Sequence, residues 1–125
     1  MEFEALKQIA QRTLAPRKLS KNAYAGSVAA ALLAANGKVY TGVCIYTPCS
    51  MGFCAEHAAV AAMVTDGESR AEQLVAVEEN GEVVPPCGRC REFLCQVHDE
   101  NHLCQVLLPG GRTKTVGQLL PDRWE

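Results

Sequence analysis

The sequence predicts a three-layer α/β/α domain with a mixed sheet of about four to five strands. Segments with helical spacing of apolar residues alternate with short runs of β-forming residues, which is the pattern of a sheet covered on both faces. The chain has 125 residues, enough for one hydrophobic core and too few for a second. Its 48% hydrophobic and 21% charged residues are typical of a folded protein. We therefore expect residues 1–125 to form a single domain, with a largely parallel sheet that starts with a hairpin.

The first part of the chain predicts one helix and one β-hairpin. Apolar residues at helical spacing favour an amphipathic helix over 3–14, which Pro16 ends. Asn36-Gly37 is typical of a two-residue hairpin turn and lies between two apolar runs. Antiparallel strands are therefore expected over 24–35 and 38–46.

The rest of the chain predicts helices and strands that complete the layers. An alanine-rich segment over 54–65 has the small residues that suit a helix packed closely on a sheet. A short buried strand is expected over 72–78, and a helix over 87–97 follows the extended pair Pro85-Pro86. The remaining expected elements are a strand over 103–108, a turn over 109–111 and a short helix over 116–120.

The charge balance and the lack of long apolar runs argue against two classes of partner, nucleic acids and membranes. Twelve Lys and Arg and 14 Asp and Glu give a formal net charge of −2, so the basic excess typical of nucleic-acid-binding proteins is missing. No apolar run approaches the roughly 18–20 residues of a membrane-spanning helix. The first ten residues also lack the basic start and apolar run of a secretory signal. We therefore expect a cytoplasmic protein that binds neither nucleic acid nor membrane.

Seven cysteines are the most informative feature of the composition. In a reducing compartment, clustered cysteines indicate metal binding or catalysis before disulfides. Two motifs stand out, Cys54-Ala55-Glu56 and Pro86-Cys87-Gly88-Arg89-Cys90, and each lies at the start of an expected helix. A helix N-terminus favours thiolates because its free N–H groups and its dipole stabilise negative charge. Cys54, Cys87 and Cys90 can thus supply three corners of a tetrahedral metal site.

Three sulfur ligands and one open position suit zinc, which lowers the pKa of a bound water toward about 7. Glu56 lies two residues after Cys54 and can move a proton between that water and a substrate. A closed structural site would instead need a fourth protein ligand, for which Cys49 and His57 are the candidates. We favour the open, catalytic site because Glu56 and Pro86 are in place beside the three cysteines in the two motifs.

Cys54-x-Glu56 followed by Pro86-Cys87-x-x-Cys90 resembles the zinc deaminases of the cytidine deaminase superfamily. Residues 36–42 are similar to the first hairpin of that family, and Leu119-Leu120-Pro121 with Trp124 is similar to its C-terminal motif. The chain length is that of the small, tetrameric branch. Within this branch, residues 86–91, Tyr46 and the Trp124-Glu125 end look closest to blasticidin-S deaminase-like members.

The resemblance implies a cytidine-deaminase-like fold, a homotetramer, and hydrolytic removal of ammonia from a small aminated heterocycle. The implied substrate is of the cytosine type, either blasticidin S or a cytidine-like nucleoside. Cys54, Cys87 and Cys90 would bind Zn²⁺, and activated water would attack the amino-bearing carbon of the ring. Glu56 would protonate the neighbouring ring nitrogen and then the leaving ammonia.

The expected substrate contacts depart from the family pattern. Nucleoside deaminases of this branch carry Asn-x-Glu at the end of the second strand, where this chain has Cys44 and Tyr46. Neither side chain can replace an amide and a carboxylate in binding a diol. The candidate substrate-binding residues are Ser27, Cys44, Tyr46 and Trp124.

Arg89 and Arg91 are expected beside the thiolates, because a guanidinium can offset the negative charge of three thiolates on one zinc ion. Two alternatives to a cytosine-type deaminase stay open. One is a deaminase of a different ring, such as a purine or a pterin. The other is a non-catalytic, structural zinc module.

Overall fold

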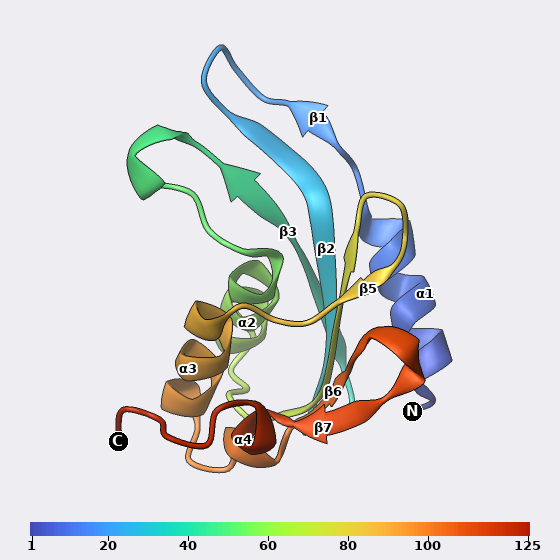
Figure 1. Cartoon of the computed structure of the whole chain (residues 1–125), viewed down its shortest axis with the longest axis vertical. Coiled ribbons are helices and arrows are strands. Elements are labelled where there is room, and N and C mark those ends of the chain that lie inside the picture. The colour runs from blue at the N-terminus through green and yellow to red at the C-terminus, as the bar shows by residue number, and fades with distance from the viewer.

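The computed structural model describes residues 1–125, which form four α-helices and one sheet (Figure 1). The helices are α1 (Phe3–Thr13), α2 (Ala55–Thr65), α3 (Gly88–Val97) and α4 (Val116–Leu119). The strands are β1 (Arg17–Lys18), β2 (Tyr24–Ala34), β3 (Val39–Tyr46), β4 (Ala71–Glu78), β5 (Val83–Val84), β6 (Gln105–Leu107) and β7 (Thr113–Thr115). Short 3₁₀ helices are η1 (Pro48–Ser50), η2 (Asn101–Leu103) and η3 (Pro109–Gly111). None of the helices has the length and apolar character needed to cross a membrane.

The seven strands form one mixed sheet with β2 and β4 at its centre. One edge of β2 pairs with β3, while its other edge pairs with β1 and, further along, with β4. Strand β4 also pairs with β5 and β6, and β7 lies beyond β6. The expected α/β class and mixed sheet are confirmed, but the expected four to five strands are too few.

The expectation of a largely parallel sheet is also wrong, since only β4 and β6 run parallel. The three strands that were not predicted, β1, β5 and β7, have two or three residues each. Such short segments are too brief to show an alternating hydrophobic pattern, and their pairing depends on the neighbouring long strands. The long strands contribute to the difference too, because β4 lies beside β2 and runs antiparallel to it.

The hairpin of β2 and β3 is present, with a turn one residue longer than Asn36-Gly37 predicts. The Ala34 N–H donates to the Lys38 carbonyl at 2.9 Å, and the Gly37 N–H donates to the Ala34 carbonyl at 3.0 Å. Three residues, 35–37, therefore form the turn. Gly37 has a φ of +84°, which a glycine adopts without the strain that a side chain would add.

Alternate residues of β2 face two separate layers of helices. Ala29, Ala31 and Leu33 pack with Leu6 and Ala10 of α1 in one hydrophobic cluster. Their neighbours along the strand, among them Leu32, belong to a second cluster with the inner faces of α2 and α3. Figure 1 shows α1 on one face of the sheet and α2 and α3 on the other. Because successive side chains of this buried strand point to opposite faces of the sheet, they contribute to two core layers, one on each face.

Small residues bring α2 close to the sheet. A Cβ atom at Gly42 of β3 would lie 2.5 Å from both the Cβ of Ala58 and the backbone nitrogen of Ala59. Only a residue without a side chain fits here, so β3 and α2 touch through their backbones. This contact places the beginning of α2 next to the end of β3.

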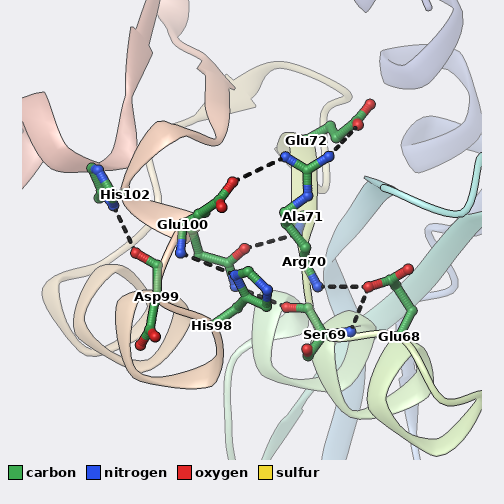
Figure 2. A network of polar contacts seen from close by, with 10 residues as sticks. Glu68, Ser69, Arg70, Ala71, Glu72, His98, Asp99, Glu100 and His102 are labelled. Atoms are coloured by element: carbon green, nitrogen blue, oxygen red, sulfur yellow. Dashed lines mark hydrogen bonds and ion pairs between the residues drawn. The ribbon is translucent and has the colours of Figure 1, made fainter.

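A polar network anchors the far end of α3 to the start of β4. Asn101 is fully buried, and its side chain donates to the carbonyls of Leu94 and Ser69 and accepts from the Ala71 N–H. Around it, the Arg70 guanidinium pairs with Glu72 and Glu100 (Figure 2). These contacts fix the direction of α3, whose first turn carries two of the candidate metal ligands.

Candidate metal centre and active site

Two helix N-termini form the centre of the candidate site. Cys54 is the N-cap residue of α2 and Cys87 is the N-cap residue of α3, while Cys90 lies in the first turn of α3. The Sγ atoms of Cys54 and Cys87 are 3.5 Å apart, and those of Cys87 and Cys90 are 3.4 Å apart. The structure therefore brings the three predicted sulfurs together.

The spacing of these sulfurs suits one zinc ion. Tetrahedral zinc with Zn–S bonds of about 2.3 Å requires sulfurs about 3.8 Å apart, a little wider than the separations of 3.5 and 3.4 Å found here. Three soft thiol donors that converge in this way are a donor set that zinc prefers.

His57 also reaches this cluster. Its Nδ1 atom lies 3.2 Å from the Sγ atom of Cys90, and the ligand atoms of Cys54, His57 and Cys90 all lie within 4.8 Å of one another. The His57 ring is stacked on Phe93 of α3, with centroids 4.2 Å apart and an angle of 6° between the planes. Burial lowers the pKa of His57, and the charge of Arg89 lowers it further, so the ring is neutral at pH 7.

Sequence reasoning favours a packed or hydrogen-bonded His57 on the helix and keeps it as a candidate fourth ligand of a closed site. The signal for its position was the spacing of three residues from Cys54, which puts both side chains on one side of α2. Its approach to Cys90 depends on how α3 packs against α2, which no local pattern reveals. The other candidate, Cys49, is exposed and lies outside this group.

The three thiols differ in acidity. Burial raises the pKa of the Cys54 thiol and, more strongly, that of the Cys90 thiol. Burial also disfavours the Cys87 thiolate, but hydrogen bonds from the Cys90 N–H and from the two neighbouring thiols outweigh it and lower the Cys87 pKa. A bound cation would offset the burial that disfavours the thiolates, so metal binding and thiol deprotonation are coupled here.

Glu56 lies beside the sulfurs in a small cavity. This residue is only 6% exposed, and burial raises the pKa of its carboxyl. The cavity has a volume of about 190 Å³, and Glu56, Cys54 and Cys87 line it. Its other walls are Val28, Cys44, Ala55, Val84 and Pro85. A carboxyl in these surroundings can hold or release a proton next to the metal ligands.

A larger cavity of about 540 Å³ opens next to the first and shares Cys44 and Cys54 with it. Ser27, Cys44 and Tyr46, which the sequence names as candidate substrate contacts, all line it. Tyr24, which by the family resemblance also falls at a substrate-contact position, lines it as well, and the lining residues that sequence reasoning missed are Ile45, Thr47, Ser50, Gly52 and Phe53. Most of them belong to the loop after β3, whose path is set by the backbone pairing of Ile45 with Phe53.

Trp124 lies away from both cavities in this chain. Its side chain is 81% exposed, and its backbone N–H donates to the carboxylate of Glu92. The structure thus does not bring Trp124 together with Ser27, Cys44 and Tyr46.

The two arginines have different surroundings. Arg89 lines the larger cavity and faces the cluster closely enough to lower the pKa of His57. Arg91 instead donates to the backbone carbonyls of Pro86 and Leu119, at 2.8 and 2.9 Å. Its guanidinium therefore links α3 to α4 and to the segment before Cys87. The sequence analysis instead expected this guanidinium beside the thiolates.

Three further cysteines complete the inventory, and all seven are free. Cys104 is buried in the core, and burial raises the pKa of its thiol to about 12. Cys95 is partly buried on α3, away from the sulfur cluster. Cys44 differs from both because it lines the two cavities at their junction.

Comparisons with known proteins agree with this geometry. Residues 4–105 match the family model of the cytidine and deoxycytidylate deaminase zinc-binding region. The chain is 39% identical over 98 residues to a cytidine deaminase from Mycobacterium tuberculosis, a match that covers 77% of this chain and 71% of that protein. It is also 39% identical over 103 residues to a cytidine deaminase from Sporosarcina psychrophila, over 75% of this chain and 71% of that protein.

The fold is similar to crystal structures of the same kind of protein. The cytidine deaminase from M. tuberculosis superposes with a TM-score of 0.83 at 30% identity, over 100% of this chain and 98% of that chain. The cytidine deaminase from M. leprae gives a TM-score of 0.81 at 26% identity, over 98% and 99% of the two chains.

Proposed function

Because the chain belongs to the family of zinc-binding cytidine and deoxycytidylate deaminases, we propose that it hydrolyses the exocyclic amino group of a cytosine-type nucleoside and releases ammonia. One observation carries this proposal. The buried Glu56 carboxyl shares a small cavity with the sulfurs of Cys54 and Cys87. A proton carrier beside an open metal position is what hydrolysis of an aminated ring requires.

In the proposed mechanism, Cys54, Cys87 and Cys90 would hold a zinc ion at the two helix N-termini. When bound, zinc acidifies water and thereby supplies a nucleophile at neutral pH. The Glu56 carboxylate accepts a proton from the attacking water and donates it to the ring nitrogen beside the amino-bearing carbon. Glu56 then carries the second proton of that water to the amino group, which leaves as ammonia while the ring gains a carbonyl.

The proposal also names candidate substrates. The relatives named above are cytidine deaminases, which supports a cytidine-like nucleoside. The similarity of residues 86–91 and Tyr46 to blasticidin-S deaminases supports blasticidin S as the other candidate. A purine or a pterin would test the third alternative, deamination of a different ring.

A structural zinc module is the second candidate function, and His57 is the observation that favours it. If the Nδ1 atom of His57 were a fourth ligand, the metal would have no open position and could not activate water. We assign His57 the role of a hydrogen-bond donor instead. Its Nδ1 atom lies at a hydrogen-bonding distance of 3.2 Å from the Cys90 sulfur, and we assign the neutral ring the tautomer with the proton on Nδ1, which donates to that sulfur.

Ammonia release from a panel of substrates tests the two candidates. The panel holds cytidine, deoxycytidine, cytosine, blasticidin S, guanine and a pterin, each with zinc-loaded protein. Glu56→Ala is the matched control because it should keep the metal and lose the proton carrier. Turnover that disappears in this control supports the deaminase. One zinc ion per chain without turnover of any panel member supports the structural module.

We further propose that residues 1–125 act as one catalytic domain in a cytoplasmic homotetramer. Seven free cysteines suit a reducing compartment, which supports the cytoplasm. The similarity in length to the small branch of the family supports the tetramer. Sedimentation equilibrium should then give a mass four times the 13.5 kDa of the chain, and a mass of 13.5 kDa would contradict the assembly.

A further inference from the structure

We propose that Arg91 is a positioning residue for the metal centre. Its guanidinium holds the peptide before Cys87 against α4, and this fixes the place of the Cys87 sulfur and of the neighbouring wall of the smaller cavity. The inference rests on the proposed deaminase function and deepens it by adding a residue outside the proposed ligands and substrate contacts. It follows from two hydrogen bonds, the burial of Pro86 and the exposure of Cys87.

The segment between β5 and α3 is held by a single hydrogen bond. Strand β5 ends at Val84 and the N-cap of α3 is Cys87, so Pro85 and Pro86 belong to neither element. Both are prolines and have no backbone N–H to donate. Their one hydrogen bond to the rest of the fold runs from the Nε atom of Arg91 to the Pro86 carbonyl, at 2.8 Å. A side chain therefore supplies the contact that backbone pairing supplies elsewhere in the sheet.

This contact controls the backbone on which Cys87 depends. Pro86 is buried, and a buried carbonyl without a hydrogen bond is costly. The planar peptide that joins Pro86 to Cys87 links the direction of this carbonyl to the position of the Cys87 Cα atom. The Cys87 side chain is exposed, so packing around the sulfur does not hold it. Arg91 restrains the backbone on both sides, because its own N–H also donates to the Cys87 carbonyl, at 3.1 Å.

The other end of the contact is anchored in the core. A second nitrogen of the Arg91 guanidinium donates to the Leu119 carbonyl at 2.9 Å. Leu119 is the last residue of α4, where helix carbonyls lack a partner within the helix. Val116, the first residue of α4, is fully buried, and its N–H donates to the Cys104 carbonyl at 2.9 Å. Helix α4 is therefore fixed to the core, and the planar guanidinium holds the segment before Cys87 at a set distance from it.

Neither helix stability nor an ion pair explains this arginine. Arg91 is the fourth residue of α3, near the N-terminus, where the helix dipole disfavours a cation. It belongs to none of the ion pairs of the protein. It also lines neither of the two cavities, so it acts on a bound substrate only through other residues. Its side chain is used for the two backbone contacts, which the N–H groups of a guanidinium make in fixed directions.

The segment that Arg91 holds also forms part of the wall around the proton carrier. Val84, Pro85 and Cys87 line the smaller cavity together with Glu56. A movement of residues 85–87 therefore changes the place of a proposed ligand and the space beside Glu56 at once. Loss of Arg91 should thus weaken metal binding and lower kcat, while KM should change little because the larger cavity keeps its walls.

The zinc affinity of four proteins provides the first test. Competition with a chelator measures the dissociation constant of zinc for the wild type, Arg91→Ala, Arg91→Lys and Arg123→Ala. Residues that orient metal ligands typically change metal affinity by about 10–100-fold when they are replaced, and we expect a loss in this range for Arg91→Ala. Arg123→Ala is the matched control, because Arg123 also joins the C-terminal segment to α3, at Cys95 and away from the sulfur cluster. Its zinc affinity should equal that of the wild type.

The lysine variant separates position from charge. Arg91→Lys keeps the positive charge and loses the planar fork, so its zinc affinity should fall by at least about tenfold. If the charge alone mattered, Arg91→Lys would bind zinc as tightly as the wild type while Arg91→Ala would not, and this result overturns the inference. Wild-type affinity in Arg91→Ala overturns it as well.

The absorption spectrum of bound Co²⁺ tests the arrangement of the ligands without turnover. The bands of Co²⁺ respond to the positions of its thiolate ligands, whereas a general loss of stability leaves them unchanged in the folded protein. We expect shifted bands for Arg91→Ala and Arg91→Lys at saturating Co²⁺, and wild-type bands for Arg123→Ala. Wild-type bands in both Arg91 variants would make the role of Arg91 merely structural and overturn the inference. Arg91→Lys carries this test alone if Arg91→Ala does not fold.

Cytidine turnover at saturating zinc links the inference to catalysis. A misplacement of about 1 Å costs up to about 100-fold in rate, so kcat of Arg91→Ala should fall by at least about tenfold with little change in KM. A change confined to KM would place Arg91 in substrate binding and overturn the inference.

The two proposals fail in different ways. If the wild type deaminates no member of the panel while both Arg91 variants bind zinc weakly and shift the Co²⁺ bands, the proposed function is wrong and the positioning role stands. If the wild type deaminates cytidine and Arg91→Ala equals it in zinc affinity, Co²⁺ spectrum and kcat, the proposed function stands and the inference about Arg91 is wrong.

Discussion

The Nδ1 atom of His57 lies 3.2 Å from the Sγ atom of Cys90, and this contact joins the first turns of α2 and α3. The two helices start at the same end of the fold, and their N-cap cysteines complete the cluster. In the role proposed above, a neutral His57 donates from Nδ1 to the Cys90 sulfur and occupies no metal position. The role of His57 therefore decides whether the fourth position of the metal is open.

His57→Ala should keep the metal and weaken its binding. Residues that hydrogen-bond metal ligands typically change metal affinity by 10–100-fold when they are replaced. We expect one zinc ion per chain at saturating zinc, measured by elemental analysis, and a dissociation constant raised within that range. The comparison variant is Cys90→Ser, which removes a proposed ligand. Equal zinc loss in the two variants would make His57 a ligand and the site closed.

The start of β4 should depend strongly on Asn101. Asn101→Ala removes three hydrogen bonds, two of them buried, and leaves the Ala71 N–H and the Leu94 carbonyl without their partner. We expect a loss of about 3 kcal/mol in the free energy of unfolding, because each unpaired buried group costs roughly 1–3 kcal/mol. Urea denaturation measures it.

The control for Asn101 is Glu100→Ala, which removes an exposed ion pair with Arg70 in the same network (Figure 2). An exposed pair contributes about 0–1 kcal/mol, so this variant should be nearly as stable as the wild type. Equal losses in the two variants would show that the buried amide has no special role.

Gly42 should not tolerate a side chain. Gly42→Ala would put a Cβ atom 2.5 Å from the Cβ of Ala58, between β3 and α2. Overpacking of this kind generally destabilises by about 1–3 kcal/mol, and we expect the upper part of that range because backbone atoms are involved. Thermal unfolding measures the loss. Gly88→Ala is the comparison, since nothing lies within 4 Å of a Cβ there, and a similar loss in both would contradict the explanation.

Asp66 should make the stability of the protein sensitive to acid. Hydrogen bonds from the Tyr40 hydroxyl, at 2.6 Å, and from the Lys38 ammonium, at 3.1 Å, lower the pKa of the Asp66 carboxyl. A carboxyl with a lowered pKa in the folded state stabilises the fold above its unfolded pKa of about 3.9. That contribution is lost as the pH falls through the folded pKa.

Asp66→Asn should therefore be less stable than the wild type at pH 7, and the difference should shrink as the pH falls below about 4. Urea unfolding of both proteins at a series of pH values measures this difference. A difference that stays constant from pH 7 to pH 2 would mean that the charge of Asp66 contributes nothing.

Local patterns in the sequence explain why much of the site could be predicted. Cys54 and Cys87 each precede a helix, and Cys90 follows Cys87 by one turn, so all three sulfurs lie at helix N-termini. The long strands β2 and β4 have runs of apolar residues that indicate buried strands. These features depend on residues close together in the chain, and the structure contains them.

Other features depend on how distant segments pack. The parallel pairing was overestimated because the order of elements does not show that β4 lies antiparallel beside β2, or that β5 and β7 fold back along β4 and β6. The contact of His57 with Cys90 requires α3 to lie against α2. Arg91 binds backbone carbonyls of segments far away along the chain, which the CxxCR pattern around it does not reveal.

The most direct test of the proposed function is the rate of cytidine deamination by Glu56→Gln, with zinc content measured in the same sample. The variant keeps the size of the buried side chain and removes its capacity to carry a proton. General acid–base catalysis contributes about 10²–10⁴-fold, so kcat should fall by at least a hundredfold while zinc stays at one ion per chain. Unchanged turnover at full zinc content would contradict the role of Glu56 and, with it, the proposed mechanism.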